Sequence, residues 1–222
     1  MPAPTRAGAV RSLADRRVDP AAARAVAAAY ADAPTRCDPL TRAAYARLVA
    51  ESDRLLRRIT SPHRPDAVSV RFTTCPEPYR SADELIASVT DDRLLEVATV
   101  AGDPYRRHPL MDSNRGGAYD RFRAVHDVLG HAGLALGFDH NGEFAVWLYQ
   151  ARLHSPLARR ALATELHGQH SVLWTTGRMA EPKAVLLDPQ LLRRSRQLAA
   201  DWVPSRGTST DASAPRWAEA AT

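Results

Sequence analysis

The first third of the chain contains two stretches in which apolar residues have helical spacing. Between residues 40 and 59, apolar positions recur every three or four residues and arginines occupy the other face, as in an amphipathic helix. Asp38-Pro39 opens this stretch, and Asp19-Pro20 opens an alanine-rich stretch that reaches about residue 32. Aspartate caps a helix N-terminus and proline fits its first turn, so both pairs predict helix starts.

The following section predicts a small sheet and a short helix. Val68, Val70 and Phe72 alternate with polar residues, which is typical of a strand, and residues 94–100 form a second strand candidate. Between these strands, Ser81 is followed three residues later by Glu84. This is the spacing of a capping box, so residues 81–89 are predicted to form a helix that begins after Ser81.

From residue 119 the pattern is helical to about residue 175, with breaks around residues 137–142 and at Ser155-Pro156. A chain of 222 residues is long enough for one well-cored domain. We therefore predict a mainly helical α+β fold over residues 19–204, a single domain in which a small β-sheet supports a helical core. The Arg/Ala-rich residues 1–18 and the Ser/Thr/Ala/Pro-rich tail, residues 205–222, are expected to be disordered.

The distribution of charge argues against two classes of partner. The net charge of +5 comes from 30 basic and 25 acidic side chains, and the arginines are spread among the acids along the chain. Nucleic-acid binding would favour a basic stripe instead. No apolar run approaches the roughly 18 residues that span a bilayer, and the N-terminus lacks the apolar core of a signal peptide. These features predict a cytoplasmic protein that binds neither nucleic acid nor a membrane.

The metal-binding side chains available are histidines and carboxylates. The two cysteines, Cys37 and Cys75, form no CxxC pair, which excludes a zinc ribbon, whereas the sequence contains eight histidines. His126 shares a helical stripe with Phe122 and Leu129, so it is expected to point into the core.

His131 follows His126 by five residues, which on a regular α-helix places it about 140° away. Gly130 resolves this difficulty if it ends or bends the helix and swings His131 back toward His126. We therefore predict that His126 and His131 are two ligands of one metal ion.

The third ligand is expected to come from a later helix. Glu165 lies within an apolar stripe with Leu162 and Leu166, where a carboxylate is costly unless it is paired or bound to a metal. Glu165 is therefore the favoured third ligand, although it could instead form a salt bridge with Arg123. Glu143 is the alternative third ligand; it could also act in catalysis, or simply be favoured by the dipole of its helix start.

Two further polar residues are candidates for roles in catalysis. Gln169 lies one turn after Glu165, where it could support that carboxylate or contact a substrate. Asp127 is placed to orient a ligand histidine, unless it is merely solvated. The other histidines of this region, His140, His154, His167 and His170, are expected at the surface.

Two histidines and one carboxylate with open coordination positions form the site of non-haem Fe(II) oxygenases. The same ligands can hold zinc or manganese for hydrolysis. The leading hypothesis is accordingly a mononuclear non-haem iron oxygenase or hydroxylase that acts on a small organic substrate. The oligomeric state is left open.

The segment His126-Asp-Val-Leu-Gly-His131 resembles the iron-binding segment of the pterin-dependent aromatic amino acid hydroxylases. In that family a His-acidic-x-x-Gly-His element supplies two ligands, and a glutamate on a later helix supplies the third. The resemblance implies His126 and His131 directly, and Glu165 by its place on a downstream helix. Arg123-Ala124 stands where the family has Pro-Asp, and Ala132-Gly133 where a proline follows the second histidine, so pterin use is not carried over.

A longer resemblance, over residues 108–171, is to a family of actinobacterial and phage-encoded proteins without a settled activity. The shared pattern comprises His108-Pro109-Leu110, Phe122-Arg-Ala-Val-His-Asp127, Gly130-His131-Ala132, Gly142-Glu143 with Trp147, and Thr164-Glu165 with Gly168-Gln169 and Ser171. It supports these positions as a set and names no reaction.

Two other functions remain open. In an HD-type phosphohydrolase, His126-Asp127 would supply adjacent metal ligands, with His108 and Asp139 as the other candidates. Alternatively, the chain could be a non-catalytic, phage-derived accessory domain.

Overall fold

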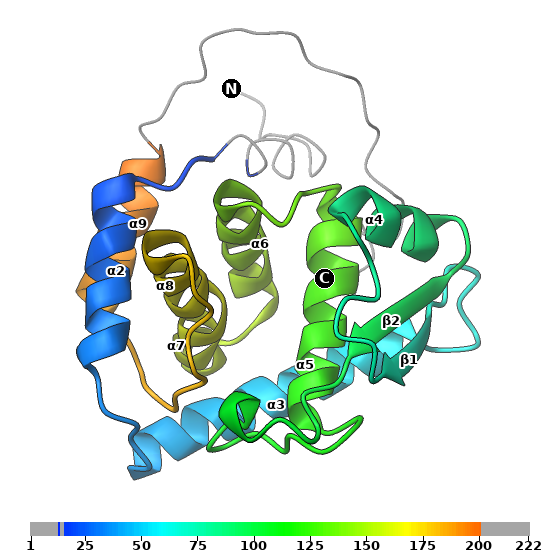
Figure 1. Ribbon diagram of the computed structural model, residues 1–222, viewed down its shortest axis with the longest axis horizontal. Coiled ribbons are helices and arrows are strands. Elements are labelled where there is room, and N and C mark those ends of the chain that lie inside the picture. The colour runs from blue at the N-terminus through cyan, green and yellow to red at the C-terminus, as the bar shows by residue number, and fades with distance from the viewer. Residues whose placement is uncertain (1–12, 14–15, 201–222) are drawn as a thin grey trace, which may run out of the picture.

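The computed structural model describes residue 13 and residues 16–200, and its architecture is mainly helical with one two-stranded sheet (Figure 1). The prediction of a mainly helical α+β domain is confirmed. The α-helices are α2 (Pro20–Asp32), α3 (Pro39–Ile59), α4 (Ala82–Thr90), α5 (Ala118–His126), α6 (His140–Leu153), α7 (Pro156–Ala163), α8 (Gln169–Thr176) and α9 (Pro189–Ala200). The remaining elements are the 3₁₀-helix η1 (Pro104–Arg106), the π-helical turns η2 (Asp127–Ala132) and η3 (Thr164–Gly168), and the strands β1 (Ser69–Thr73) and β2 (Leu94–Ala98).

The predicted helix starts are confirmed by their capping hydrogen bonds. The Asp19 carboxylate accepts a hydrogen bond from the Ala22 amide at 2.8 Å, and the Asp38 carboxylate accepts one from the Thr41 amide at 2.9 Å. Each bond satisfies an amide that has no partner within the helix. Ser81 caps α4 in the same way, whereas the Glu84 carboxylate reaches the amide of Arg80 rather than that of Ser81.

The two strands pair in parallel, with Ser69 opposite Leu94 and Thr73 opposite Ala98. Parallel strands need a crossover connection, and here α4 provides it and packs against β2 and η2. The first strand begins one residue after the predicted start at Val68, and the second ends two residues before the predicted end at residue 100.

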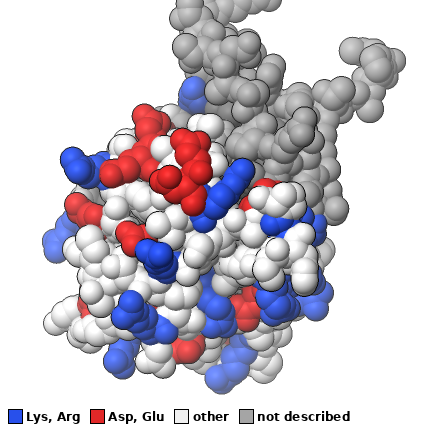
Figure 2. Space-filling model, turned by 90° about the vertical axis from the view of Figure 1, so that its right-hand side faces the viewer, with Lys and Arg blue, Asp and Glu red and all other residues white. Residues whose placement is uncertain are grey.

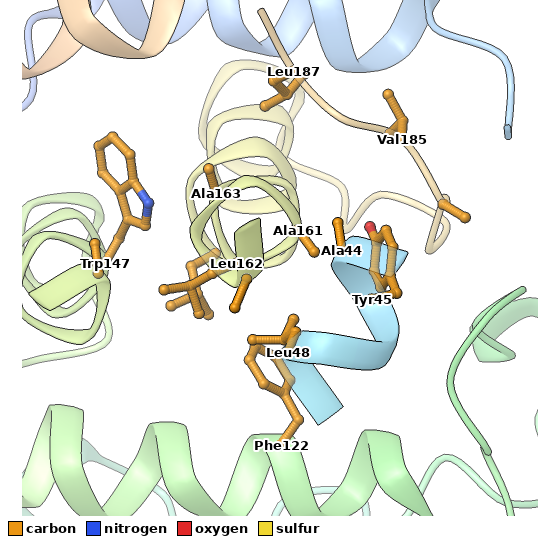
Figure 3. Packing of buried hydrophobic residues seen from close by; sticks show 14 of the residues in the cluster. Ala44, Tyr45, Leu48, Phe122, Trp147, Ala161, Leu162, Ala163, Val185 and Leu187 are labelled. Atoms are coloured by element: carbon orange, nitrogen blue, oxygen red, sulfur yellow. The ribbon is translucent and has the colours of Figure 1, made fainter. Parts of the chain in front are cut away.

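The core forms where α3, α5 and α7 meet. Tyr45 and Leu48 of α3, Phe122 of α5 and Leu162 of α7 converge there (Figure 3). On the other side of α7 and α8, helices α2 and α9 pack against each other, and α2 packs against α8 (Figure 1). Trp147 of α6 is fully buried within the same core.

The chain ends differ in part from expectation. Most of the segments expected to be disordered, residues 1–18 and 205–222, lie outside the described residues. Within the first segment, however, Leu13 is buried, and the Val18 amide donates a hydrogen bond to Asn141 of α6. Helix α9 follows the region in which helices were predicted and adds a layer beside α2. Among the described residues, no helix combines the length and apolarity needed to cross a membrane.

Candidate metal centre

The two predicted ligands meet because the helix carrying them widens into a π-turn. Helix α5 continues into η2 past Gly130, so the helix does not end at this glycine, whereas the expected approach of His131 to His126 is confirmed. A π-turn bonds residue i to residue i+5 and brings residues five apart onto one side. His126 Nε2 consequently lies 3.0 Å from His131 Nε2.

Gly130 serves helix packing instead. A Cβ atom at this position would lie 2.4 Å from Val146 Cγ1 of α6, a separation that real Cβ atoms do not show. The missing side chain lets α6 approach η2 closely. This approach also brings the first turn of α6, which carries Glu143, to the two histidines.

Glu143 completes the cluster. Its Oε2 atom lies 3.3 Å from His126 Nε2, and its Oε1 atom lies 3.3 Å from His131 Nε2. All three side chains are buried, and each offers one ligand atom within 4.8 Å of the others. In the described part of the chain, this is the group of histidine, cysteine and carboxylate side chains that could hold a metal ion.

The hydrogen bond between His131 and the backbone shows which ring nitrogen points its lone pair at the cluster. His131 Nδ1 lies 3.1 Å from the Leu136 carbonyl oxygen, which can only accept a hydrogen bond. Nδ1 therefore carries the proton, and the neutral ring presents an unprotonated Nε2 to His126 and Glu143. A hydrogen bond from the ring nitrogen that does not face the metal is typical of metal-ligating histidines.

The converging atoms need a positive charge among them. Glu143 Oε2 is buried and has no hydrogen-bond partner among the described residues. Two ligand atoms that are each about 2.1 Å from one ion lie about 3.0 Å apart at a right angle and about 3.4 Å apart at a tetrahedral angle. The separations of 3.0 and 3.3 Å in the cluster fit this range.

Without a metal, protons take this place. Burial alone would lower the pKa of His131, but the Glu143 carboxylate outweighs burial and raises it to about 9. Burial would likewise raise the pKa of Glu143, but the imidazoles of His170, His131 and His126 hold it well below its usual value. The cluster thus stabilises a cation, and a metal ion would displace the proton on His131.

His170 is a member of this neighbourhood that the sequence pattern missed. The expectation that it lies at the surface is wrong, because its Nε2 atom is 3.3 Å from Glu143 Oε1. Its Nδ1 atom is 2.8 Å from the Leu166 carbonyl oxygen, so His170 shares the ring orientation of His131. On a regular helix, His170 would point about 140° away from Glu165. The π-turn η3 lies between the two residues and changes this angle, which explains why the sequence pattern missed His170.

Glu165 lies in a separate cluster of hydrogen-bond donors. Its Oε1 atom accepts bonds from Tyr45 Oη at 2.7 Å and His108 Nε2 at 3.2 Å, and its Oε2 atom accepts one from Gln169 Nε2 at 2.6 Å. His108 Nδ1 accepts two backbone amides, from Leu110 and Met111, each at 3.0 Å. His108 Nε2 therefore carries the proton that it donates.

The structure thus groups Glu143, and not Glu165, with the two histidines. The salt bridge considered between Glu165 and Arg123 is also absent from the described residues, since Arg123 donates to the Ala98 carbonyl. Glu165 is tolerated in the core because hydrogen bonds from three neutral side chains replace water around its carboxylate.

Asp127, Glu143, Glu165 and Gln169 line one cavity of about 560 Å³ together with His126 and His131, whereas Asp139 does not belong to its lining. Asp127 is half-buried beside His126, and burial raises the pKa of its carboxyl group. Gln169 is held by Glu165 and presents a buried amide to the cavity wall. Asp139 caps α6 through the amides of Asn141 and Gly142.

Two other histidines expected at the surface are buried. His167 stacks on Trp147 with ring centroids 4.4 Å apart, and its Nε2 atom lies 2.8 Å from Ser195 Oγ. His154 is buried next to Ser155. His154 follows the last residue of α6, and its Nδ1 atom lies 2.8 Å from the Gln150 carbonyl oxygen. The helical wheel could not reveal the position of His167, because the π-turn η3 and the approach of α9 determine what faces it.

No protein-family model matches the chain, and neither the curated proteins nor the solved structures contain a significantly similar one.

Proposed function

We propose that this protein is a metal-dependent enzyme whose ion is held by His126, His131 and Glu143. The observation that carries this proposal is the convergence of two imidazole nitrogens and a carboxylate that has no hydrogen-bond donor for Oε2. Buried polar atoms in proteins are normally satisfied. A divalent cation among these three side chains satisfies them together.

The reaction class we propose is oxidation of a small organic substrate by a mononuclear non-haem iron enzyme. Two histidines and one carboxylate leave coordination positions free, the arrangement that such oxygenases use. Iron(II) bound there would supply oxygen activation. Zinc or manganese fits the same donors, so the identity of the ion is a matter for metal analysis.

The cavity beside the cluster supports a small-molecule substrate. Its volume of about 560 Å³ lies within the roughly 300–1,000 Å³ of typical ligand pockets. Tyr105, Phe138 and Met179 line its exposed rim, while Glu143 and His131 lie in the buried part. A substrate would therefore lie between the exposed rim, which these three apolar side chains help to form, and the buried polar cluster.

The chain's own residues would position and polarise such a substrate. Gln169 is held rigidly by Glu165, so its amide offers a fixed hydrogen-bonding group in the cavity wall. Asp127, whose pKa is raised by burial, and His170, next to Glu143, are titratable groups in the same wall. We assign positioning to Gln169 and leave proton transfer to Asp127 or His170.

A phosphohydrolase of the HD type receives less support. It would need His108 or Asp139 beside His126 and Asp127, whereas His108 donates to Glu165 and Asp139 caps α6.

Metal analysis of protein purified without oxygen tests the proposal. We expect about one equivalent of Fe(II) in the unchanged protein and in Glu165→Gln, and loss of iron in Glu143→Gln. Glu165→Gln is the matched control because it makes the same substitution at a buried glutamate of the same cavity. Stoichiometric zinc that iron cannot replace would overturn the oxygenase proposal, and retention of metal by Glu143→Gln would overturn the ligand assignment.

A further inference from the structure

A second cavity lies away from the metal centre and is surrounded by arginines. It has a volume of about 350 Å³ between α6, α7, α9 and the segment before α2, and it shares no lining residue with the metal cavity. Arg16, Arg152, Arg159 and Arg196 line it, over a floor of Leu13, Leu148 and Ala151. No aspartate or glutamate of the described chain belongs to the lining.

Three of the four arginines contact neutral groups. Arg16 donates to the Ala199 carbonyl at 3.4 Å, and Arg159 donates to the His154 carbonyl at 2.7 Å. The Arg196 guanidinium lies 4.8 Å from the centre of the Trp147 ring. Within residues 13 and 16–200, none of the cavity's arginines forms an ion pair.

The lining differs from that of the metal cavity, which contains four acidic residues: Asp127, Glu143, Glu165 and Glu181. On the face drawn in Figure 2, basic side chains are interspersed with acidic ones. The arginines elsewhere also include paired examples, such as Arg121 with Asp53 and Arg64 with Asp66. Around the second cavity, four arginines lie together with no acidic side chain of the described residues in the lining; Arg152 and Arg196 are exposed, and Arg16 and Arg159 are half-buried. Partial burial and neighbouring Arg159 lower the pKa of Arg196.

Like charges that lie close together repel one another, and water and salt screen only part of this repulsion at the half-buried Arg16 and Arg159. An anion bound among the four guanidinium groups would remove the rest. A single carboxylate would leave most of the four guanidinium groups uncompensated. A phosphate group carries up to two charges and accepts paired hydrogen bonds from arginine, so two linked phosphate groups match the four arginines. We propose that this cavity is a binding site for an anion with two or more linked phosphate groups. Its size, at the lower end of the range for ligand pockets, suits a small anion of this class.

Calorimetric titration of the full chain with inorganic pyrophosphate tests the proposal. We expect saturable binding with one site, and an affinity that falls as salt is added. The double substitution Arg159→Gln with Arg196→Gln should weaken binding roughly a hundredfold, since each lost charge-assisted contact costs on the order of tenfold. Arg152→Gln should weaken it roughly tenfold; Arg152 has no described partner, so its loss leaves the fold intact.

Two controls separate this site from other effects. Arg57→Gln removes the same charge from an exposed position on α3 and should leave the affinity unchanged. Pyrophosphate can also bind metals, so His131→Ala is titrated in parallel and should bind pyrophosphate as the unchanged protein does. Binding that is lost in His131→Ala and kept in the double arginine variant would place the anion at the metal centre and overturn the proposal.

The source of the phosphate groups is tested by competition. A nucleoside triphosphate that displaces pyrophosphate would identify a nucleotide-type ligand, whereas weaker binding than pyrophosphate would favour the free anion; both outcomes support the site. Failure of pyrophosphate to bind at low salt, or equal pyrophosphate affinities of the double arginine variant and the unchanged protein, would overturn it.

Discussion

Glu143 and Glu165 line the same cavity, are both almost fully buried and both contact a histidine, yet their surroundings are opposite. Glu165 faces three donors: a phenol, a protonated imidazole nitrogen and an amide. Glu143 faces imidazole nitrogens that carry no proton in the neutral rings of His131 and His170, because Nδ1 of each ring donates to a backbone carbonyl. The backbone contact behind each histidine, and not the histidine itself, determines whether its glutamate is neutralised by hydrogen bonds or requires a cation.

The difference between the two glutamates is tested most directly at Glu143. Glu143→Gln replaces a carboxylate oxygen with an amide group, and we expect metal affinity to fall by more than about 100-fold, because even residues behind metal ligands contribute 10–100-fold. Glu165→Gln should change metal affinity by less than about tenfold. Metal content after dialysis, measured side by side for the two variants, checks this. Equal losses in both would mean that the two glutamates do not differ as described.

For the stability of the metal-free protein, the larger effect is expected at Glu165. In Glu165→Gln an amide replaces one carboxylate oxygen, so a donor faces either Gln169 or the donors Tyr45 and His108. Hydrogen bonds to a charged acceptor are then lost or replaced by weaker bonds to a neutral amide, and the free energy of unfolding should fall by about 1–3 kcal/mol. Urea unfolding of the metal-free protein measures this. A loss below about 0.5 kcal/mol would show that the donor cluster contributes little to the fold.

The approach of α6 to η2 can be tested at Gly130. Gly130→Ala would place its Cβ atom 2.4 Å from Val146 Cγ1, so α6 must shift or the π-turn must relax. We expect a destabilisation of about 1–3 kcal/mol, as for other overpacked cores, together with weaker metal binding. Val146→Ala introduced together with Gly130→Ala should restore much of the metal binding. If the single variant binds metal normally, the close approach is not what positions Glu143.

The smallest effect is expected at His167, which shares the π-turn η3 with Glu165 but faces the core. Burial lowers the pKa of His167 to about 3 in the folded state, below the ordinary value of 6.5. Between these values the unfolded chain binds more protons, so stability falls with decreasing pH, by at most about 1.4 kcal/mol per pH unit from this group. His167→Gln should reduce this slope between about pH 6 and pH 4, measured by urea unfolding, without changing metal content at neutral pH.

Much of the fold could be predicted from local sequence. Asp19-Pro20, Asp38-Pro39 and Ser81 act within one helical turn, so their capping interactions depend on neighbouring residues alone. The amphipathic stripe of α3 likewise reflects a periodicity that is complete in the sequence. The register of β1 and β2 was not predictable in this way, because it depends on the crossover through α4.

For the candidate site, the sequence by itself pointed to His126 and His131, because His126 lies on an apolar stripe and Gly130 allowed the helix geometry to change before His131. The π-turn that joins them appeared only in the structure. Only the tertiary structure decided the carboxylate. Glu143 and Glu165 both lie among apolar neighbours in the sequence, and periodicity cannot show what faces each of them. Gly130 lets α6 bring Glu143 to the histidines, while Tyr45 and His108, from distant segments, supply donors to Glu165. The choice depends on contacts between residues far apart in the chain, which no local pattern encodes.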